Sequence, residues 1–510
     1  MQAPEPSAPS PLRHNRPYMI LWSGQAISQL GDGIQGIAFP LLVLYLTHSA
    51  LSAGVAGALF SLPYLILGLP AGVLVDRWNR KRVMMTCDTI RTINAVSVPL
   101  TAALGHLTIM QLYMNTLVEG SCFAFFSLAA LASLPRVVPK EQLMAATARN
   151  QASMSTIGLI APPLGGFIFQ TLGQTIPFVL NAVSYAVSVI SLRLIRLDFQ
   201  MERKAPELSF RADLKEGTVW LWNEPVLRLT TLITAGINLS AAPLGLILIV
   251  RARDLHASAI LIGVMLAIGS IGGTVGSLLA PRLQKQLRFE RVFVASTWYQ
   301  ALIVVLIAFA PNPILLGCLM ALLGVAGPVY NAVTMGYRLA ATPDDLQGRV
   351  NSAARVVAFA PIPISSLLAG FLLVTIGAVP AIFACAATRL AVALLATSFV
   401  ASRGGSRDES SPRLSEPAIA VDREVFEMAQ RLKQCTEQER TILCLRFALD
   451  GEGFRSLAEV ASAQRLSQNE VRELEIRALG KLTGASAVWA PRTCPTPPQS
   501  QNSSPGKPAY

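Results

Sequence analysis

The sequence predicts an all-α membrane protein with twelve transmembrane helices in two six-helix repeats, followed by a small C-terminal helix-turn-helix module. Charged residues make up only 14% of the 510 residues and mean hydropathy is +0.48, whereas a soluble domain carries about 25% charge. Apolar stretches of membrane-spanning length recur until about residue 402, and the composition then turns polar. Five pairs of identical residues lie 204 positions apart, which indicates a duplication.

The apolar stretches set the positions of the twelve spans. A helix needs about 20 mainly apolar residues to cross about 30 Å of hydrocarbon. On this measure the expected spans are residues 18–46, 52–75, 83–104, 107–134, 143–171, 175–197, 226–250, 258–280, 290–310, 313–338, 350–376 and 379–401.

The distribution of Lys and Arg predicts the orientation. The connections after spans two, four, six, eight and ten are basic, whereas Arg251 and Arg253 are the cations of the opposite connections. Because basic loops stay in the cytoplasm, both termini are expected there, in a bacterial plasma (inner) membrane. The net charge of +12 then reflects cytoplasmic loops rather than nucleic-acid binding. Residues 1–16 show no cleavage-site pattern, so we expect a cytoplasmic tail and not a signal peptide.

The positions of the spans and the change in composition divide the chain into seven segments. They are a tail at 1–16, a first six-helix half at 17–197, a cytoplasmic linker at 198–225, a second six-helix half at 226–402, a linker at 403–421, a helical module at 422–484 and a disordered tail at 485–510. The repeated pairs are Gly72 and Gly276, Pro139 and Pro343, Gly166 and Gly370, Phe167 and Phe371, and Gly173 and Gly377. Two parallel repeats are typical of a secondary transporter.

The loop after span two carries a family resemblance. It contains Gly72, Asp76, Arg77, Arg80, Lys81 and Arg82, a run that resembles the signature loop of the major facilitator superfamily. The resemblance implies that the acid caps the start of helix eleven, near Val350, and that the cations form a cytoplasmic gate. Asn79 stands where the family usually has Gly, and the second-half copy has Ala280 and Pro281 in the acid region.

A second run, in span five, resembles the end of the family's antiporter motif. Pro162, Gly165 and Gly166 match it, while Ala161 replaces the expected Gly. Small residues allow helices to approach closely, and Pro kinks a helix. The resemblance to this motif therefore favours antiport. The stretches around residues 132–151 and 343–356 further resemble the branch that includes siderophore and macrolide exporters.

Charges inside the spans are the candidate coupling and substrate residues, because charge in a bilayer is expensive. Asp32 lies halfway along span one and Glu119 inside span four, so either can carry a proton if transport is proton-coupled. Asp32 can equally be a cavity acid that contacts substrate or a helix end, and Glu119 can lie near the outer mouth. Arg91 is expected to pair with Asp88, three residues earlier.

Arg389, in span twelve, is a candidate contact for an anionic substrate or a first-half acid. Several aromatic and Met side chains can line an apolar cavity or face lipid, and the sequence does not separate the two. They include Phe60, Tyr64, Phe123, Phe126, Tyr330 and Met335.

The C-terminal module resembles region four of bacterial sigma factors, a helix-turn-helix that reads promoter DNA. The matching residues include Glu439, Arg440, Leu445, Arg446, Phe447, Leu449, Asp450, Leu457, Glu459, Val471, Arg472, Glu475, Ala478 and Leu479. A turn is expected at 449–451, and Ser467 is expected to cap the last helix.

The residues at the family's base-reading positions favour protein contact over DNA contact. These positions hold Gln468, Asn469 and Glu473 where Arg, Glu and Gln are usual, and Glu470 replaces a family Arg. Gln468 and Arg472 are the remaining candidate DNA contacts. Residues 422–484 hold ten Lys or Arg and eleven Asp or Glu, so the attraction to phosphate is missing. A passive fusion remnant is a third interpretation.

Together these patterns predict a secondary transporter, and the family resemblance implies proton-coupled efflux by alternating access. The branch resemblance alone implies small amphipathic substrates of drug, macrolide or siderophore type. The alternative is a membrane-tethered sensor that acts through the C-terminal module. No phosphate-binding loop or metal-ligand cluster is present and the seven cysteines form no CxxC pair, so we expect no enzyme activity, no cofactor and no metal site. The expected partners are a small-molecule substrate, protons, lipid and a protein that contacts the module.

Overall fold

The computed structural model describes residues 12–139, 142–197, 199, 210–286, 288–343, 346–404, 436–446, 457–464 and 466–483. These residues form two compact units, which divide between Leu414 and Ser415. Both units are helical, and the described residues contain no β-strand.

The membrane unit contains fourteen α-helices among its described residues. Those of the first half are α1 (Arg16–Thr47), α2 (Ala50–Arg77), α3 (Arg80–Ala103), α4 (Ile109–Val137), α5 (Leu143–Thr171) and α6 (Ile176–Leu194). α7 (Phe210–Asn223) follows, and the second half comprises α8 (Pro225–Asp254), α9 (Ala259–Gln286), α10 (Phe289–Ala308), α11 (Pro313–Ala341), α12 (Gln347–Phe359), α13 (Pro361–Thr375) and α14 (Ala378–Gly404).

Each of the twelve predicted spans coincides with a helix or, in one case, with two consecutive helices. Eleven of the described stretches are long and apolar enough to cross a membrane. The one predicted span that is not among these eleven is α3. Its composition is less apolar, because it carries three cations in its first turn and both Asp88 and Arg91 further along. The charges of α3 are therefore the feature that needs a partner inside the bundle.

The helices depart from the sequence prediction in two places. The span expected at 350–376 is built from α12 and α13, which meet at Ala360 just before Pro361. Proline lacks the amide hydrogen that continues a helical ladder, so it marks the boundary between them. The linker expected at 198–225 contains α7, which packs on α12 through the Arg349–Glu216 ion pair at 2.7 Å.

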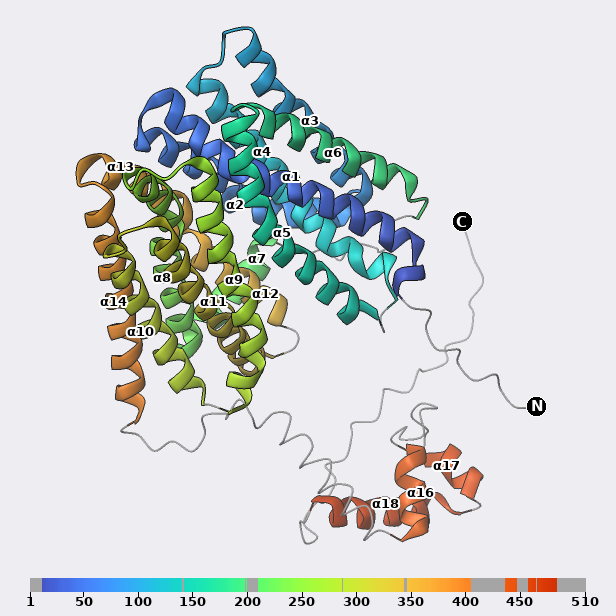
Figure 1. Ribbon diagram of the computed structural model, residues 1–510. Helices are drawn as coiled ribbons and strands as arrows, with labels where there is room; N and C mark the ends of the chain where they lie inside the picture. The colour runs from blue at the N-terminus through green and yellow to red at the C-terminus, as the bar shows by residue number, and fades with distance from the viewer. Residues whose placement is uncertain are drawn as a thin grey trace, which may run out of the picture. The chain divides into compact units, whose positions relative to one another are not determined.

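The two halves form separate helix bundles that contact each other along two pairs of helices. Figure 1 shows α1–α6 gathered in one bundle and α8–α14 in the other. α5 packs along α9, and α2 packs along α13. Each pair joins one helix of the first half to one of the second, as expected for a duplicated protein whose halves move against each other.

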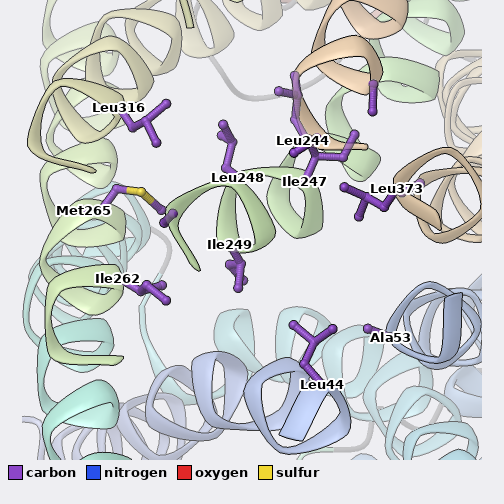
Figure 2. Close-up of a cluster of buried hydrophobic side chains, with 14 of the residues drawn as sticks. Leu44, Ala53, Leu244, Ile247, Leu248, Ile249, Ile262, Met265, Leu316 and Leu373 are labelled. Carbon is purple, nitrogen blue, oxygen red and sulfur yellow. The ribbon is translucent and has the colours of Figure 1, made fainter. Parts of the chain in front are cut away.

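One end of the membrane unit, where α1 and α8 both finish, is closed by a continuous apolar core, and we call it the sealed end. Figure 2 shows Leu44 and Ala53 of the first half opposite Leu244, Ile249 and Leu373 of the second. All five side chains are buried. Apolar packing between the halves therefore closes this end to water.

Glycines allow the close helix approach at the sealed end. A Cβ atom on Gly166 of α5 would collide with the backbone carbonyl of Ala259 on α9, and one on Gly263 of α9 would collide with that of Pro162. Gly54 of α2 and Gly370 of α13 meet in the same way, each facing the other's backbone. The small residues are thus required where the halves touch.

The C-terminal unit contains three described helices, α16 (Glu437–Arg446), α17 (Leu457–Gln464) and α18 (Gln468–Thr483). Ile442, Val460, Ala461 and Val471 form its buried core. The predicted cap at Ser467 is confirmed, because its hydroxyl accepts from the Glu470 amide at 3.3 Å while Glu470 Oε2 accepts from the Ser467 amide at 2.8 Å. The turn expected at 449–451 lies outside the described residues.

Candidate functional site

A cavity of about 510 Å³ lies inside the membrane unit, lined by both halves. Its walls are mainly apolar, but polar and charged side chains of the first half gather on one side. The lining residues are Asp32, Gln35, Gly36, Phe39, Pro40, Ala53, Ala56, Gly57, Phe60, Arg91, Asn115, Thr116, Glu119, Phe123, Asn181, Gly245, Leu246, Ile249 and Leu266. The cavity is large enough for a small molecule with an apolar body.

Arg91 of α3 is the centre of the charged side. Its Nε donates to Glu119 Oε1 of α4 at 2.6 Å, and its Nη2 donates to Asp32 Oδ1 of α1 at 3.3 Å. The guanidinium also lies 4.2 Å from the ring centroid of Tyr185 on α6. One cation therefore links three helices and rests on an aromatic ring of a fourth, an arrangement that favours its charged form.

Tyr185 connects the two acids a second time. Its hydroxyl donates to Asp32, and it lies 2.8 Å from Glu119 Oε1. Asn181, one turn earlier on α6, donates to Gln35 of α1 at 2.8 Å. The carboxylates are thus held by donors from α3 and α6, and a change at one acid is felt by the other.

Local sequence explains why Asp32 reaches this network. It stands between two glycines, and a Cβ atom on Gly31 would collide with Ser184 and Asn181 of α6, whereas one on Gly33 would collide with Ala161 of α5. Close packing against α5 and α6 therefore fixes the backbone on both sides of the acid. Its side chain stays 35% exposed, compared with 9% for Glu119 and 3% for Arg91. Asp32 is consequently the member of the network that meets the cavity most directly.

Asp88 is a third acid beside the same guanidinium. Its Oδ1 lies 3.7 Å from Arg91 Nη1, so the expected pair is present, but the contacts of Arg91 with Glu119 and Asp32 are shorter. The Asp88 carboxylate is fully buried, and neither oxygen has a hydrogen-bond partner among the described residues. We define the acid cluster as Asp32, Asp88 and Glu119 around Arg91.

The two acids singled out in the sequence are therefore brought together, and Glu119 lies buried against Arg91. Tyr185, Asn181 and Gln35 were not predicted from the sequence. The sequence does contain a signal for them, because these three polar side chains interrupt otherwise apolar spans. Buried polar groups in a membrane need partners.

Arg389 lies apart from the acid cluster. It is 3% exposed on α14 and donates to Gln300 of α10. Its Nε and the Gln300 Nε2 have no hydrogen-bond partner among the described residues. The candidate contact with a first-half acid is not made in the described structure.

The structure gives the loop after α2 a packing role within its own half. Arg80 Nη1 donates to the Ala132 carbonyl of α4 at 2.8 Å, and Lys81 donates to the Ile195 carbonyl after α6. Arg77 and Arg82 are exposed, and Gly72 and Asp76 lie in the last turns of α2. The side chain of Asp76 lies outside the described part of the structure, and so does the capping contact expected of it.

The antiporter-like motif lies at a junction of three helices. Gly165 of α5 faces Ile34 and Ile37 of α1, while Pro162 and Gly166 face α9 of the second half. Of the predicted cavity-lining aromatic residues, Phe60 and Phe123 line the cavity, with ring centroids 6.0 Å apart. The Tyr330 hydroxyl instead donates to the Thr230 carbonyl at 3.2 Å within the second half.

The C-terminal unit presents a mixed-charge face on α18. Gln468 and Arg472 are exposed, and Glu473 pairs with Arg477 at 3.3 Å. Hydrogen bonds from the Ser467 amide and hydroxyl hold the pKa of Glu470 below its usual value, so this acid stays ionised at the start of the helix. A phosphate backbone would therefore meet carboxylates here as well as guanidinium groups.

No group of three or more His, Cys, Asp or Glu side chains in the described ranges is placed to hold a metal ion. The chemistry that the acid cluster can perform is instead proton exchange and cation binding next to a cavity.

Comparison with known proteins identifies families that match the two parts of the chain. Residues 6–428 match the family described as transmembrane secretion effector, and residues 431–483 match sigma-70, region 4. The chain is 25% identical over 369 residues to the multidrug efflux pump Tap of Mycolicibacterium fortuitum, covering 69% of this chain and 88% of Tap. It is 24% identical over 340 residues to the enterobactin exporter EntS of Citrobacter koseri, covering 67% and 81%.

The fold is similar to that of a bacterial homologue of the iron transporter ferroportin in its inward-facing state. The TM-score is 0.59 at 15% identity, and the match covers 75% of this chain and 98% of the homologue.

Proposed function

The chain belongs to the transmembrane secretion effector family of major facilitator transporters, and from that premise we propose that it exports amphipathic cations in exchange for protons. Its relatives are a multidrug efflux pump and an enterobactin exporter, which confirms the predicted transporter class and the prediction that the chain is not an enzyme. Its membership of this family and its apolar helices indicate that the chain is a multi-pass protein of the inner membrane. The coupling ion, the substrate charge and the orientation belong to the proposal.

The observation that carries the proposal is the imbalance of charge in the acid cluster. Three carboxylates share the single guanidinium of Arg91, and all four side chains lie beside the cavity or behind its wall. Burying excess negative charge in a membrane is costly, so the cluster favours binding a proton or a cationic substrate. The two ligands neutralise the same charge and therefore compete, which is the requirement for antiport.

Asp32 is the group at which the exchange is proposed to occur. Its side chain is the most exposed of the cluster, and its contacts with Arg91, at 3.3 Å, are longer than those of Glu119. A substrate ammonium can replace Arg91 at Asp32 while its apolar body packs on Phe60 and Phe123 across the cavity. A siderophore that carries negative charge would instead meet the carboxylate, so we favour cations of the drug or macrolide type.

Alternating access is supported by where the halves touch. Apolar packing and glycine contacts join them at the sealed end, which the positive-inside rule assigns to the periplasmic side. Toward the opposite end, the Tyr64 hydroxyl of α2 lies 2.7 Å from Arg355 Nη2 of α12. Polar contacts of this kind separate at less cost than a packed apolar core, so the cavity is proposed to open to the cytoplasm in this state.

Dye-reported proton movement in inverted membrane vesicles tests this function. Adding a cationic macrolide should release protons in vesicles that contain wild-type protein. Asp32→Asn should reduce the response at least tenfold, because it removes the exchangeable carboxylate. A chain ending at Arg403 should respond like wild type. A full response by Asp32→Asn, or equal responses to anionic and cationic substrates, would contradict the proposal.

We infer that the C-terminal unit contacts protein rather than promoter DNA. Ile476 is 54% exposed on α18, beside the mixed-charge Glu473–Arg477 pair. An exposed apolar side chain within a nearly neutral surface suits a protein partner better than a phosphate backbone. The match to sigma-70, region 4 supports the alternative function, in which the membrane unit senses a solute and this unit contacts transcription machinery.

Full-length protein in nanodiscs should show no promoter-DNA binding above that of the chain ending at Arg403. The measurement is fluorescence anisotropy of labelled DNA at 50 and 200 mM salt, since phosphate contacts give a steep salt dependence. Binding that needs residues 404–510 and weakens on Arg472→Gln would instead favour the DNA-reading interpretation.

A further inference from the structure

A second cavity, of about 750 Å³, lies on the first half between α3 and α4, and we call it the α3–α4 groove. It starts at the loop between α2 and α3 and runs along one face of α3. Its lining residues are Arg77, Trp78, Asn79, Arg82, Val83, Thr86, Cys87, Ile90, Ser121, Cys122 and Phe125. None of these side chains lines the central cavity, so the groove is a separate site.

The groove faces outward from the bundle. Ile90 lines it and is 41% exposed, and Ile93 and Leu100 continue along the same helix at 67% and 57% exposure. Apolar side chains this exposed on a membrane-spanning helix contact lipid. The lower part of the groove therefore opens into the hydrocarbon region.

The rim of the groove is cationic. Arg77 and Arg82 are both exposed, and neither forms an ion pair with any described residue. The neighbouring cations of the same loop, Arg80 and Lys81, are already engaged with backbone carbonyls of α4 and of the residue after α6. Asn79 caps α3 through the Arg82 amide at 3.1 Å. Two guanidinium groups are thus left at the mouth, beside the positive end of a helix dipole.

The walls change from polar to apolar in the order that a lipid would require. Trp78, at the mouth, stacks on Phe125 with ring centroids 6.3 Å apart. Tryptophan prefers the level of the lipid headgroups. Below it the floor is formed by the buried Cys87 and Cys122, followed by Ile90.

We propose that the α3–α4 groove binds one acidic phospholipid, with its phosphate between Arg77 and Arg82 and an acyl chain along Trp78, Phe125 and Ile90. Charge complementarity selects the headgroup, because the rim offers two guanidinium groups without a described acidic partner. The apolar length of the groove selects a lipid over a free phosphate, which would leave that length uncovered.

The position of the groove gives the lipid a consequence for the acid cluster. Cys122 follows Glu119 by one turn of α4, and Cys87 directly precedes Asp88 on α3. A bound acyl chain therefore covers the α3–α4 seam behind the buried acids, and it keeps water away from them on the lipid side.

Quenching of Trp78 by brominated lipid tests the proposal. Full-length protein is reconstituted in phosphatidylcholine vesicles with increasing amounts of brominated phosphatidylglycerol or brominated phosphatidylcholine. The Trp78 signal is the difference between wild type and Trp78→Phe. We expect half-quenching at a mole fraction about tenfold lower for the acidic lipid, because its net negative charge is attracted to the two guanidinium groups, whereas phosphatidylcholine carries no net charge.

Removing the rim charge should abolish this preference. In the double variant Arg77→Gln with Arg82→Gln, both lipids should quench the Trp78 fluorescence equally. The control is Arg282→Gln with Arg288→Gln, which removes two cations in and just after α9 and should keep the tenfold difference. Thr86→Glu provides a second variant, because it puts a carboxylate in the groove and should also remove the preference. Three results would each contradict the proposed lipid site. They are equal quenching by the two lipids in wild type, a preference for the acidic lipid that persists in Arg77→Gln with Arg82→Gln, and loss of that preference in the control.

Discussion

Replacing Arg91 with glutamine should lower the free energy of unfolding of the membrane unit by about 3–5 kcal/mol. The guanidinium is 3% exposed and lies against Asp32, Asp88 and Glu119. Glutamine leaves the buried acids Asp88 and Glu119 and the partly exposed Asp32 without a cation, and an uncompensated buried charge is far more costly than a lost surface pair. Thermal unfolding followed by a thiol-reactive dye measures the loss, because Cys87 and Cys122 are buried between the same helices.

Arg389→Gln is the matched control. Arg389 is also 3% exposed in a membrane helix, but its described partner is the neutral amide of Gln300. Its removal leaves no buried anion, so the unfolding midpoint should stay unchanged or rise. Equal losses in the two variants would show that burial of any arginine, and not the acid cluster, sets the effect.

A second variant tests whether unpaired negative charge causes the loss of stability in Arg91→Gln. Adding Glu119→Gln to Arg91→Gln removes one of the unpaired acids and should recover part of the stability, as should a lower pH, at which proton binding neutralises the carboxylates. Non-additive recovery in the double-mutant cycle is expected because the two side chains are in direct contact.

The membrane fold could be predicted because its signal is long and repeated. About 20 apolar residues per span, basic alternate loops and the duplicated glycines specify helix number and the two halves, and the homologous exporters confirm the class. The break before Pro361 and helix α7 were missed, since a proline in a membrane helix is compatible with a kink and α7 is short and amphipathic.

The acid cluster could be predicted only in part. Asp32 and Glu119 were found from the cost of buried charge, but their common partner Arg91 was assigned to Asp88 because those two residues are three apart on one helix. The contacts of Arg91 with Asp32 and Glu119 join residues that are 59 and 28 positions apart in the sequence, respectively. Spacing within one helix carries no information on such contacts, which depend on how α1, α3, α4 and α6 pack.

Adding a single methyl group at each of Gly166 and Gly263 should reduce transport at least tenfold while leaving the protein folded. Each Cβ atom would collide with a backbone carbonyl of the opposite half at the sealed end. Overpacking of this kind costs about 1–3 kcal/mol per site, and 1.4 kcal/mol shifts an equilibrium tenfold. The cost applies only to the state in which α5 and α9 touch, so the variant should favour the state in which they separate.

Gly273→Ala is the matched control, because the same methyl group at this position of α9 meets no atom within 4 Å. Ala53→Cys reports the state, since Ala53 is 6% exposed within the apolar core of the sealed end. A membrane-impermeant thiol reagent added from the periplasmic side should label this cysteine faster in Gly166→Ala with Gly263→Ala than in wild type or Gly273→Ala. Slow labelling together with lost transport would mean that the glycines serve folding rather than closure. Fast labelling together with lost transport would identify their contacts as the surface on which one half closes against the other.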